Sequence, residues 1–150
     1  MAEELSSQEH FPINSVTDVL SARRRGLEIA LTMGFPYPEA CKIAVVISEL
    51  GWNIKRHAGQ GSITLTTHAG EGKHIQIVAQ DQGPGIPDIE RVLAGGYSTS
   101  QGLGLGISGS RRLMDEFEIQ SVVGEGTTIR VVKSLHYNFR RESGAVRPIG

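Results

Sequence analysis

The sequence lacks several features that would assign it to a whole class of proteins. It has one cysteine, Cys41, so no disulfide can form within the chain, as is typical of proteins from a reducing cytoplasm. Its longest aliphatic run, residues 43–47, falls far short of the roughly 20 residues that a membrane-spanning helix needs. Residues 1–10 are polar and acidic, without the basic start and apolar core of a secretion signal. These absences predict a cytoplasmic protein that does not enter a membrane.

An excess of charge of either sign is also missing. Lysine and arginine number 15 and acidic residues 16, which gives a formal net charge of −1 at pH 7. Because no overall positive field is available, we expect neither nucleic acid nor anionic membrane as a partner. Hydrophobic residues make up 39% of the 150 residues, enough for one core. We expect a single domain over residues 11–136, with flexible tails at 1–10 and 137–150.

Hydrophobic periodicity and turn residues predict the elements of this domain. Helices are expected from residue 15 or 17 to about 33, from about 39 to 58, and over 105–117. Strands are expected over 11–15, 62–67, 74–80, 118–123 and 127–133, the last four forming two hairpins. Helices and strands segregated in this way favour a two-layer α/β sandwich, with a mixed, mostly antiparallel sheet and helices on one face.

The second predicted helix carries a polar row beside its apolar stripe. Glu49, Asn53 and His57 follow one another at four-residue steps, so they share one flank of the helix. Asn53 and the neighbouring Gly51 are both unfavourable inside a helix, and such local conflicts are typical of functional sites. A solvated helix edge would explain the same spacing.

Magnesium chemistry favours a site on this flank. Mg²⁺ takes oxygen ligands, usually one or two from the protein and the rest from phosphates and water. The Asn53 carboxamide could supply one of them, and the Glu49 carboxylate could orient or deprotonate an attacking hydroxyl. Both roles require a nucleotide nearby.

The glycine-rich half of the chain offers a nucleotide pocket. Asp81 ends a predicted strand and is followed by Gly83 and Gly85, an arrangement that suits recognition of an exocyclic amine such as adenine N6. A solvent turn is the alternative, because aspartate, glycine and proline all favour turns.

Residues 95–106 lead directly into a predicted helix, where free backbone N–H groups form a natural phosphate site. Hydroxyls of Ser98, Thr99 and Ser100 could add donors. Residues 104–109 also fit the dinucleotide pattern G-x-G-x-x-G, but that pattern should follow an apolar strand, and the preceding residues are small and polar. The one Gly-Lys pair, residues 72–73, is followed by histidine, so no phosphate-binding P-loop is present. A flexible linker is the remaining alternative for this stretch.

Together these residues resemble the GHKL (Bergerat-fold) superfamily of ATPases and kinases. Four motifs occur in its order: Glu49-Leu50-x-x-Asn53-x-x-x-His57, Asp81-x-Gly83-x-Gly85, Gly102-x-Gly104-x-Gly106 and Gly124-x-Gly126-Thr127. Within the superfamily, residues 81–89, 96–100 and 112–117 closely resemble the switch serine kinases of bacterial stressosomes, which are related to the anti-sigma-factor kinases.

The resemblance implies an ATP- and Mg²⁺-dependent kinase. It would phosphorylate serine or threonine on STAS-domain antagonist or scaffold proteins and, once released, bind and activate a PP2C-type phosphatase. Glu49 would be the catalytic carboxylate, Asn53 the metal ligand, and Asp81 the adenine acceptor, supported by Thr127. The other nucleotide-binding residues would be Gly83, Gly85, Ser98, Thr99, Gly102, Leu103, Gly104, Leu105 and Gly106. A non-catalytic ATP-gated binding switch and a detached histidine-kinase domain are the alternatives.

Two departures from the family pattern stand out. Some anti-sigma kinases have an arginine just before the lid glycines, where this chain has Ser100 and Gln101. In those kinases the arginine lies near the γ-phosphate. In this chain the positive charge must come from another residue or be missing, which bears on the rate of turnover rather than on nucleotide binding. The second helix also carries Trp52, which either packs against the first helix or docks a partner; packing is favoured.

Overall fold

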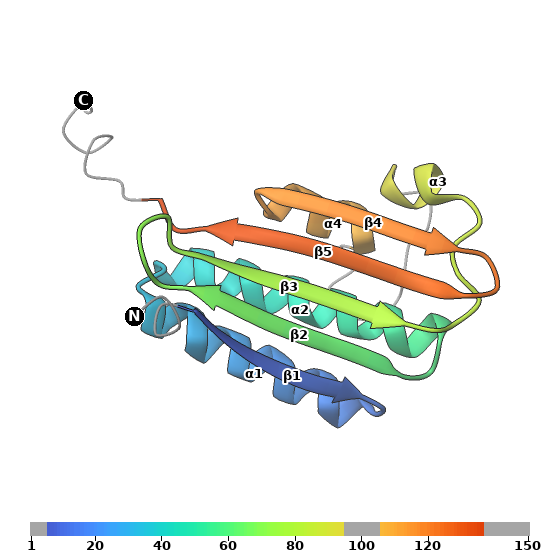
Figure 1. The fold of residues 1–150 in the computed structure, drawn as a ribbon, viewed down its shortest axis with the longest axis horizontal. Coiled ribbons are helices and arrows are strands. Elements are labelled where there is room, and N and C mark those ends of the chain that lie inside the picture. Colours follow the sequence, from blue (N-terminus) through green and yellow to red (C-terminus); the bar gives the residue numbers. More distant parts are fainter. Residues whose placement is uncertain (1–5, 95–105, 137–150) are drawn as a thin grey trace.

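The computed structural model in Figure 1 is an α/β sandwich of two layers. It describes residues 6–94 and 106–136. The strands are β1 (Ser6–Ile13), β2 (Gly61–His68), β3 (His74–Asp81), β4 (Glu116–Val122) and β5 (Gly126–Ser134). The helices are α1 (Val16–Met33), α2 (Tyr37–His57), α3 (Ile89–Leu93) and α4 (Gly106–Leu113). The predicted fold class is therefore confirmed. No described helix is long and apolar enough to cross a bilayer.

The sheet has the order β1-β2-β3-β5-β4, and every pairing between its described strands is antiparallel. The expectation of a mixed sheet was wrong, because the pairs β1-β2 and β3-β5, which no hairpin joins, are antiparallel as well. Inward residues of the central strands, such as Ile63, Ile77 and Ile129, are almost fully buried. Alternate residues on the other face are polar and partly exposed, so the helices cover one face only.

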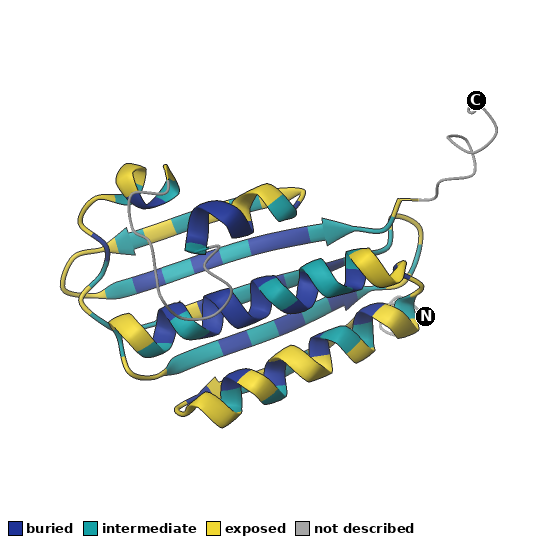
Figure 2. Ribbon diagram, turned by 180° about the vertical axis from the view of Figure 1, so that it is seen from behind, coloured by how far each residue is buried: buried dark blue, intermediate teal, exposed yellow. Residues whose placement is uncertain are grey.

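Helix α2 lies at the centre of the helical layer, between α1 and α4 (Figure 2). Its predicted stripe of Ile43, Val46, Ile47, Leu50 and Ile54 is buried against the sheet. Trp52, on another side of the helix, is partly buried against the core, which supports packing, while packing against α1 in particular stays a prediction.

Helix α1 begins and ends where the sequence predicts. Ser15 caps it through a capping box with Asp18, and Gly34 ends it in the left-handed conformation with φ 103°. Helix α2 starts at Tyr37, two residues earlier than expected, because Pro38 fits the first turn of a helix, where backbone N–H groups have no partner anyway.

The N-terminal strand is longer than the sequence predicts. Ser6–His10 belong to β1, so half of the expected flexible tail pairs with β2. Side chains support the pairing: the Ser7 and Thr67 hydroxyls lie 2.8 Å apart. The apolar alternation is broken at Glu9, which points inward but binds Arg25 of α1 at 2.7 Å. Because Glu9 is a charged residue at an inward position, the pattern of apolar residues did not predict a strand here.

The helix expected over residues 105–117 is shorter. Helix α4 ends at Leu113, and residues 116 and 117 begin β4. Asp115 turns the chain into the sheet, because its N–H donates to the Val132 carbonyl at 2.9 Å and its carboxylate accepts from the Ser134 N–H at 2.7 Å. The short helix α3, capped by Asp88, was not predicted.

Gly51 owes its place in α2 to the neighbouring helix. A Cβ at this position would lie 2.8 Å from Cγ1 of Val19 on α1. The glycine thus permits close packing of α1 on α2 and is not itself a mark of the functional site. This corrects the sequence-based interpretation.

Gly51→Ala is therefore expected to lower the free energy of unfolding. Overpacking costs about 1–3 kcal/mol, and the better helix propensity of alanine offsets about 1 kcal/mol of it. In a Val19→Ala background, where the contacting methyl groups are gone, the same substitution should cost nothing or stabilise. Denaturant unfolding of the unmodified protein, Gly51→Ala, Val19→Ala and the double variant checks this. If Gly51→Ala cost the same free energy in both backgrounds, the contact with Val19 would not be its cause.

Candidate functional site

The polar row on α2 is buried. Glu49 is 3% exposed and Asn53 4% exposed, whereas His57 at the end of the helix is exposed. A solvated helix edge, the alternative explanation of this spacing, does not bury two polar residues. These side chains sit next to the core residues Leu50 and Ile54 and must therefore find partners of their own.

Glu49 joins α2 to α4. Its carboxylate oxygen Oε1 accepts a hydrogen bond of 3.2 Å from the backbone N–H of Gly106, the first residue of α4. Arg56 is close enough to interact with Glu49: burial lowers the pKa of the Arg56 guanidinium, and attraction to Glu49 acts against that lowering. A helix N-terminus and a guanidinium both attract negative charge, so this position suits a carboxylate.

Asn53 differs from Glu49 in having no hydrogen-bond partner within the part of the chain that the structure describes. An unsatisfied buried amide costs free energy and calls for an explanation. Its oxygen fits a hard cation, but the described residues contain no group of three acidic, histidine or cysteine side chains that could hold one alone. The donor set thus fits Mg²⁺ held partly by phosphates, and not a metal site built from protein alone.

A second polar group lies at the end of the sheet. Asp81, Thr127 and Ser121 are register partners across β3, β5 and β4, all on the face toward the helices. The Asp81 carboxylate accepts from the Gly83 N–H at 2.9 Å. The Ser121 and Thr127 hydroxyls lie 2.8 Å apart, and Ser121 also accepts from the Ile86 N–H at 2.7 Å. Ser121 was missed by sequence analysis, although a serine at an inward strand position was the available signal.

The two groups meet at the C-terminal end of α2. His57, one turn after Asn53, is near enough to Asp81 for the carboxylate to favour the charged form of the imidazole. A Cβ on Gly83 would lie 2.6 Å from Cβ of Ala58, so the loop after Asp81 packs directly on the end of the helix. The predicted adenine-end residues therefore lie against the C-terminal end of the helix that carries Glu49 and Asn53.

Gly85 has a structural reason of its own. Its φ is 80°, and a Cβ there would lie 2.5 Å from the Val122 carbonyl oxygen. The Gly124 N–H donates to the Pro84 carbonyl at 2.9 Å, which fixes the loop against the turn between β4 and β5. Gly83 and Gly85 are thus required by local packing, whether or not a ligand approaches them.

The predicted phosphate-binding residues are only partly covered by the structure. Gly106 is described and begins α4, where it contacts Glu49. The others lie outside the described residues: Ser98, Thr99, Gly102, Leu103, Gly104 and Leu105.

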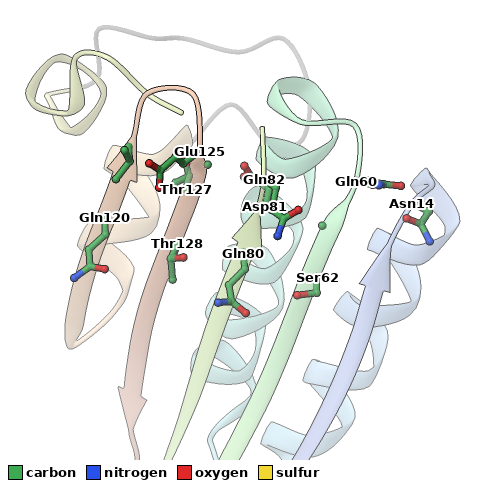
Figure 3. A pocket seen from close by; sticks show the side chains of 13 residues that line it. Asn14, Gln60, Ser62, Gln80, Asp81, Gln82, Gln120, Glu125, Thr127 and Thr128 are labelled. Carbon is green, nitrogen blue, oxygen red and sulfur yellow. The ribbon is translucent and has the colours of Figure 1, made fainter. Parts of the chain in front are cut away.

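A hollow of about 620 Å³ lies at the same end of the sheet, but its lining is mainly on the opposite face. Figure 3 shows Gln80, Thr128 and Gln120 extending from β3, β5 and β4. These residues alternate with the buried inward ones, and only Asp81 and Thr127 at the rim are shared with the predicted site. Glu49 and Asn53 do not line it, so we assign the chemistry to the helix side, where buried polar groups gather.

His57 should make the stability of the protein depend on pH. Partial burial and then the positive charge of Arg56 lower the pKa of His57, and the attraction of Asp81 only partly opposes them. The unfolded chain therefore binds a proton more readily, so stability is lost as the pH falls below about 6.5. We expect His57→Gln to lose less stability than the unmodified protein between about pH 7.5 and about pH 5.5. If chemical denaturation showed the same loss in the free energy of unfolding for both proteins over this pH range, the prediction would be contradicted.

Comparisons with known proteins show the family of this chain. A family model described as "Histidine kinase-, DNA gyrase B-, and HSP90-like ATPase" matches residues 41–136. The chain is 45% identical over 132 residues to "Serine/threonine-protein kinase RsbT" of Bacillus subtilis (strain 168), covering 87% of this chain and 99% of the relative. It is 31% identical over 102 residues to "Anti-sigma F factor" of Thermoanaerobacter sp. (strain X514), covering 65% and 71%.

Among solved structures, the fold is similar to the RsbU and RsbW domains of Rv1364c from Mycobacterium tuberculosis. The TM-score is 0.61 at 15% identity, and the match covers 86% of this chain and 32% of that one. At this identity the likeness concerns the fold alone.

Proposed function

This chain belongs to the histidine kinase-, DNA gyrase B- and HSP90-like ATPase family and, within it, to the serine/threonine-protein kinases related to the Bacillus subtilis protein, and we propose that it transfers the γ-phosphate of ATP to serine or threonine side chains of STAS-domain partner proteins. The observation that carries the proposal is the pair of buried polar residues Glu49 and Asn53, one helical turn apart, with the asparagine unpartnered among the described residues. A kinase needs a group for the attacking hydroxyl and a group for the metal, and this pair supplies both.

In the proposed reaction, Glu49 accepts the proton of the attacking hydroxyl while the hydroxyl oxygen bonds to the γ-phosphorus and ADP leaves. The Gly106 N–H donates a hydrogen bond to this carboxylate, and the guanidinium of Arg56 attracts it. Arg56 is also a described cation near the reacting end of the site, where the lid positions Ser100 and Gln101 carry no positive charge. It is our candidate for the compensating cation.

Asn53 would hold Mg²⁺ through its carboxamide oxygen. When bound, the ion supplies positive charge that offsets the charge of the phosphates. Asp81 would accept a hydrogen bond from the adenine amine, and Thr127 beside it would bind the same edge of the base. The remaining contacts to the phosphates would come from the glycine-rich residues outside the described range.

The names of the relatives support a role in signalling between partner proteins. One relative is named an anti-sigma factor, and another is named a serine/threonine-protein kinase. We propose that the chain acts in a bacterial partner switch in the cytoplasm. It would phosphorylate STAS-domain antagonist or scaffold proteins and, when released from them, bind and activate a PP2C-type phosphatase.

Incubation with γ-labelled ATP, Mg²⁺ and a STAS-domain protein encoded near this chain tests the proposal. Label should move to the partner and survive acid, as phosphoserine and phosphothreonine do. Acid-labile label would instead identify a detached histidine-kinase domain. Tight ATP-dependent association without label transfer would support the non-catalytic switch, which the absence of a lid arginine favours.

A further inference from the structure

The strongest feature that the proposed reaction leaves unused is the Ser121 hydroxyl. It lies within hydrogen-bond distance of three groups: the Ile86 N–H at 2.7 Å, the Thr127 hydroxyl at 2.8 Å and the Gly126 carbonyl at 3.2 Å. Ile86 belongs to the loop after Asp81, whereas Gly126 and Thr127 begin β5. One side chain therefore connects the two segments that flank the expected adenine end of the site.

The directions of these hydrogen bonds follow from counting protons. A serine or threonine hydroxyl has one proton and two lone pairs, and a backbone N–H can only donate. Ser121 accepts from Ile86, so its own proton goes either to Gly126 or to Thr127. Thr127 is 5% exposed, and Ser121 is its one partner among the described residues.

Only one arrangement pairs both hydroxyl protons within the described structure. In it Ser121 donates to the Gly126 carbonyl, and Thr127 donates to Ser121. The opposite arrangement leaves the Thr127 proton unpaired at a buried position, which costs free energy. With its proton turned toward Ser121, Thr127 can offer only lone pairs to a ligand.

Thr127 and Asp81 are register partners on the same face of the sheet, and an ionised carboxylate also only accepts. The side chains of Asp81 and Thr127 therefore present acceptors alone. Adenine carries an amino group where guanine carries a carbonyl oxygen, which would meet these lone pairs without a proton between them. Buried groups left unpaired by the wrong ligand discriminate strongly.

We propose that Ser121 is a positioning residue that fixes Thr127 as an acceptor and thereby selects adenine over guanine nucleotides. The inference rests on the proposed ATP site and adds a specificity determinant to it. It also gives Ser121 a second task, since the bond from Ile86 holds the loop that carries the glycines after Asp81.

Ser121→Ala removes the acceptor of both hydrogen bonds and frees the Thr127 proton to turn toward a ligand. Calorimetry with MgATP and MgGTP should show ATP bound about 5–10-fold more weakly and the preference for ATP over GTP reduced about tenfold. Ser121→Thr, which keeps the hydroxyl, should restore the preference. Thr128 follows Thr127 in β5 and lies on the opposite face of the sheet. Thr128→Ala is therefore the matched control and should leave the preference for ATP over GTP unchanged.

Hydrogen exchange adds a readout that needs no nucleotide: the Ile86 amide should exchange faster in Ser121→Ala than in the unmodified protein. If Ser121→Ala does not fold, Ser121→Cys, with a weaker donor and acceptor, should show the same shifts to a smaller extent. If the unmodified protein bound ATP and Ser121→Ala kept the same preference for ATP over GTP, this inference alone would be overturned. No ATP binding by the unmodified protein would overturn the proposed function as well.

Discussion

Glu49→Gln is expected to reduce phosphotransfer by about 10²–10⁴-fold while leaving ATP affinity nearly unchanged. Glutamine has the same shape and its carbonyl oxygen can still accept the hydrogen bond from the Gly106 N–H, but it cannot take a proton from the attacking hydroxyl. Glu49→Ala should lose the same activity and also the link between α2 and α4. The glutamine variant is thus the sharper test, since it separates chemistry from structure.

Single-turnover transfer of labelled phosphate and calorimetric ATP binding, measured on the same preparations, check this result. Glu71→Gln, at an exposed position in the turn between β2 and β3, is the matched control and should retain full activity. If Glu49→Gln transferred phosphate at the normal rate, Glu49 would not be the base and the polar row would have only a structural role.

Asp81→Asn is expected to remove most ATP binding. The asparagine oxygen can still accept from the Gly83 N–H, so the loop should keep its position. Its second side-chain atom, however, becomes a donor that faces the adenine amine, another donor. An unpaired buried donor costs about 1–3 kcal/mol or more, which weakens binding about 5–150-fold.

The comparison with Gln80→Ala makes this test specific. Gln80 is next to Asp81 in β3 but lies on the face away from the helices, where it lines the hollow of Figure 3. If the nucleotide binds on the helix side, Gln80→Ala should bind ATP normally. Weaker binding by Gln80→Ala together with normal binding by Asp81→Asn would move the nucleotide to the open face.

Patterns within one element were enough to predict a large part of this structure. The ends of α1 follow from Ser15 and Gly34, and the shared flank of Glu49 and Asn53 on α2 follows from their four-residue spacing, although their burial does not. Such features depend on residues within a few positions of one another. For this reason they are visible in a sequence before any tertiary contact is known.

The features that were missed depend on distant contacts. Strand β1 starts early because Glu9 meets Arg25 across two elements. The glycine at position 51 reflects Val19, which is 32 positions away by residue number (51 − 19). The role of Ser121 arises only when β4 is paired with β5 and the loop carrying Ile86 folds over both.

The order of the strands has a consequence for how the protein is made. β5 occupies an interior place in the sheet, between β3 and β4, although it is the last described strand to be synthesised. Until the ribosome has released it, β3 and β4 each have an open edge, and edges of this kind aggregate readily. Thr127 also arrives with this strand, so the proposed nucleotide site is complete only when the sheet is complete. Ligand-dependent protease resistance of stalled chains should therefore appear abruptly, once β5 has emerged.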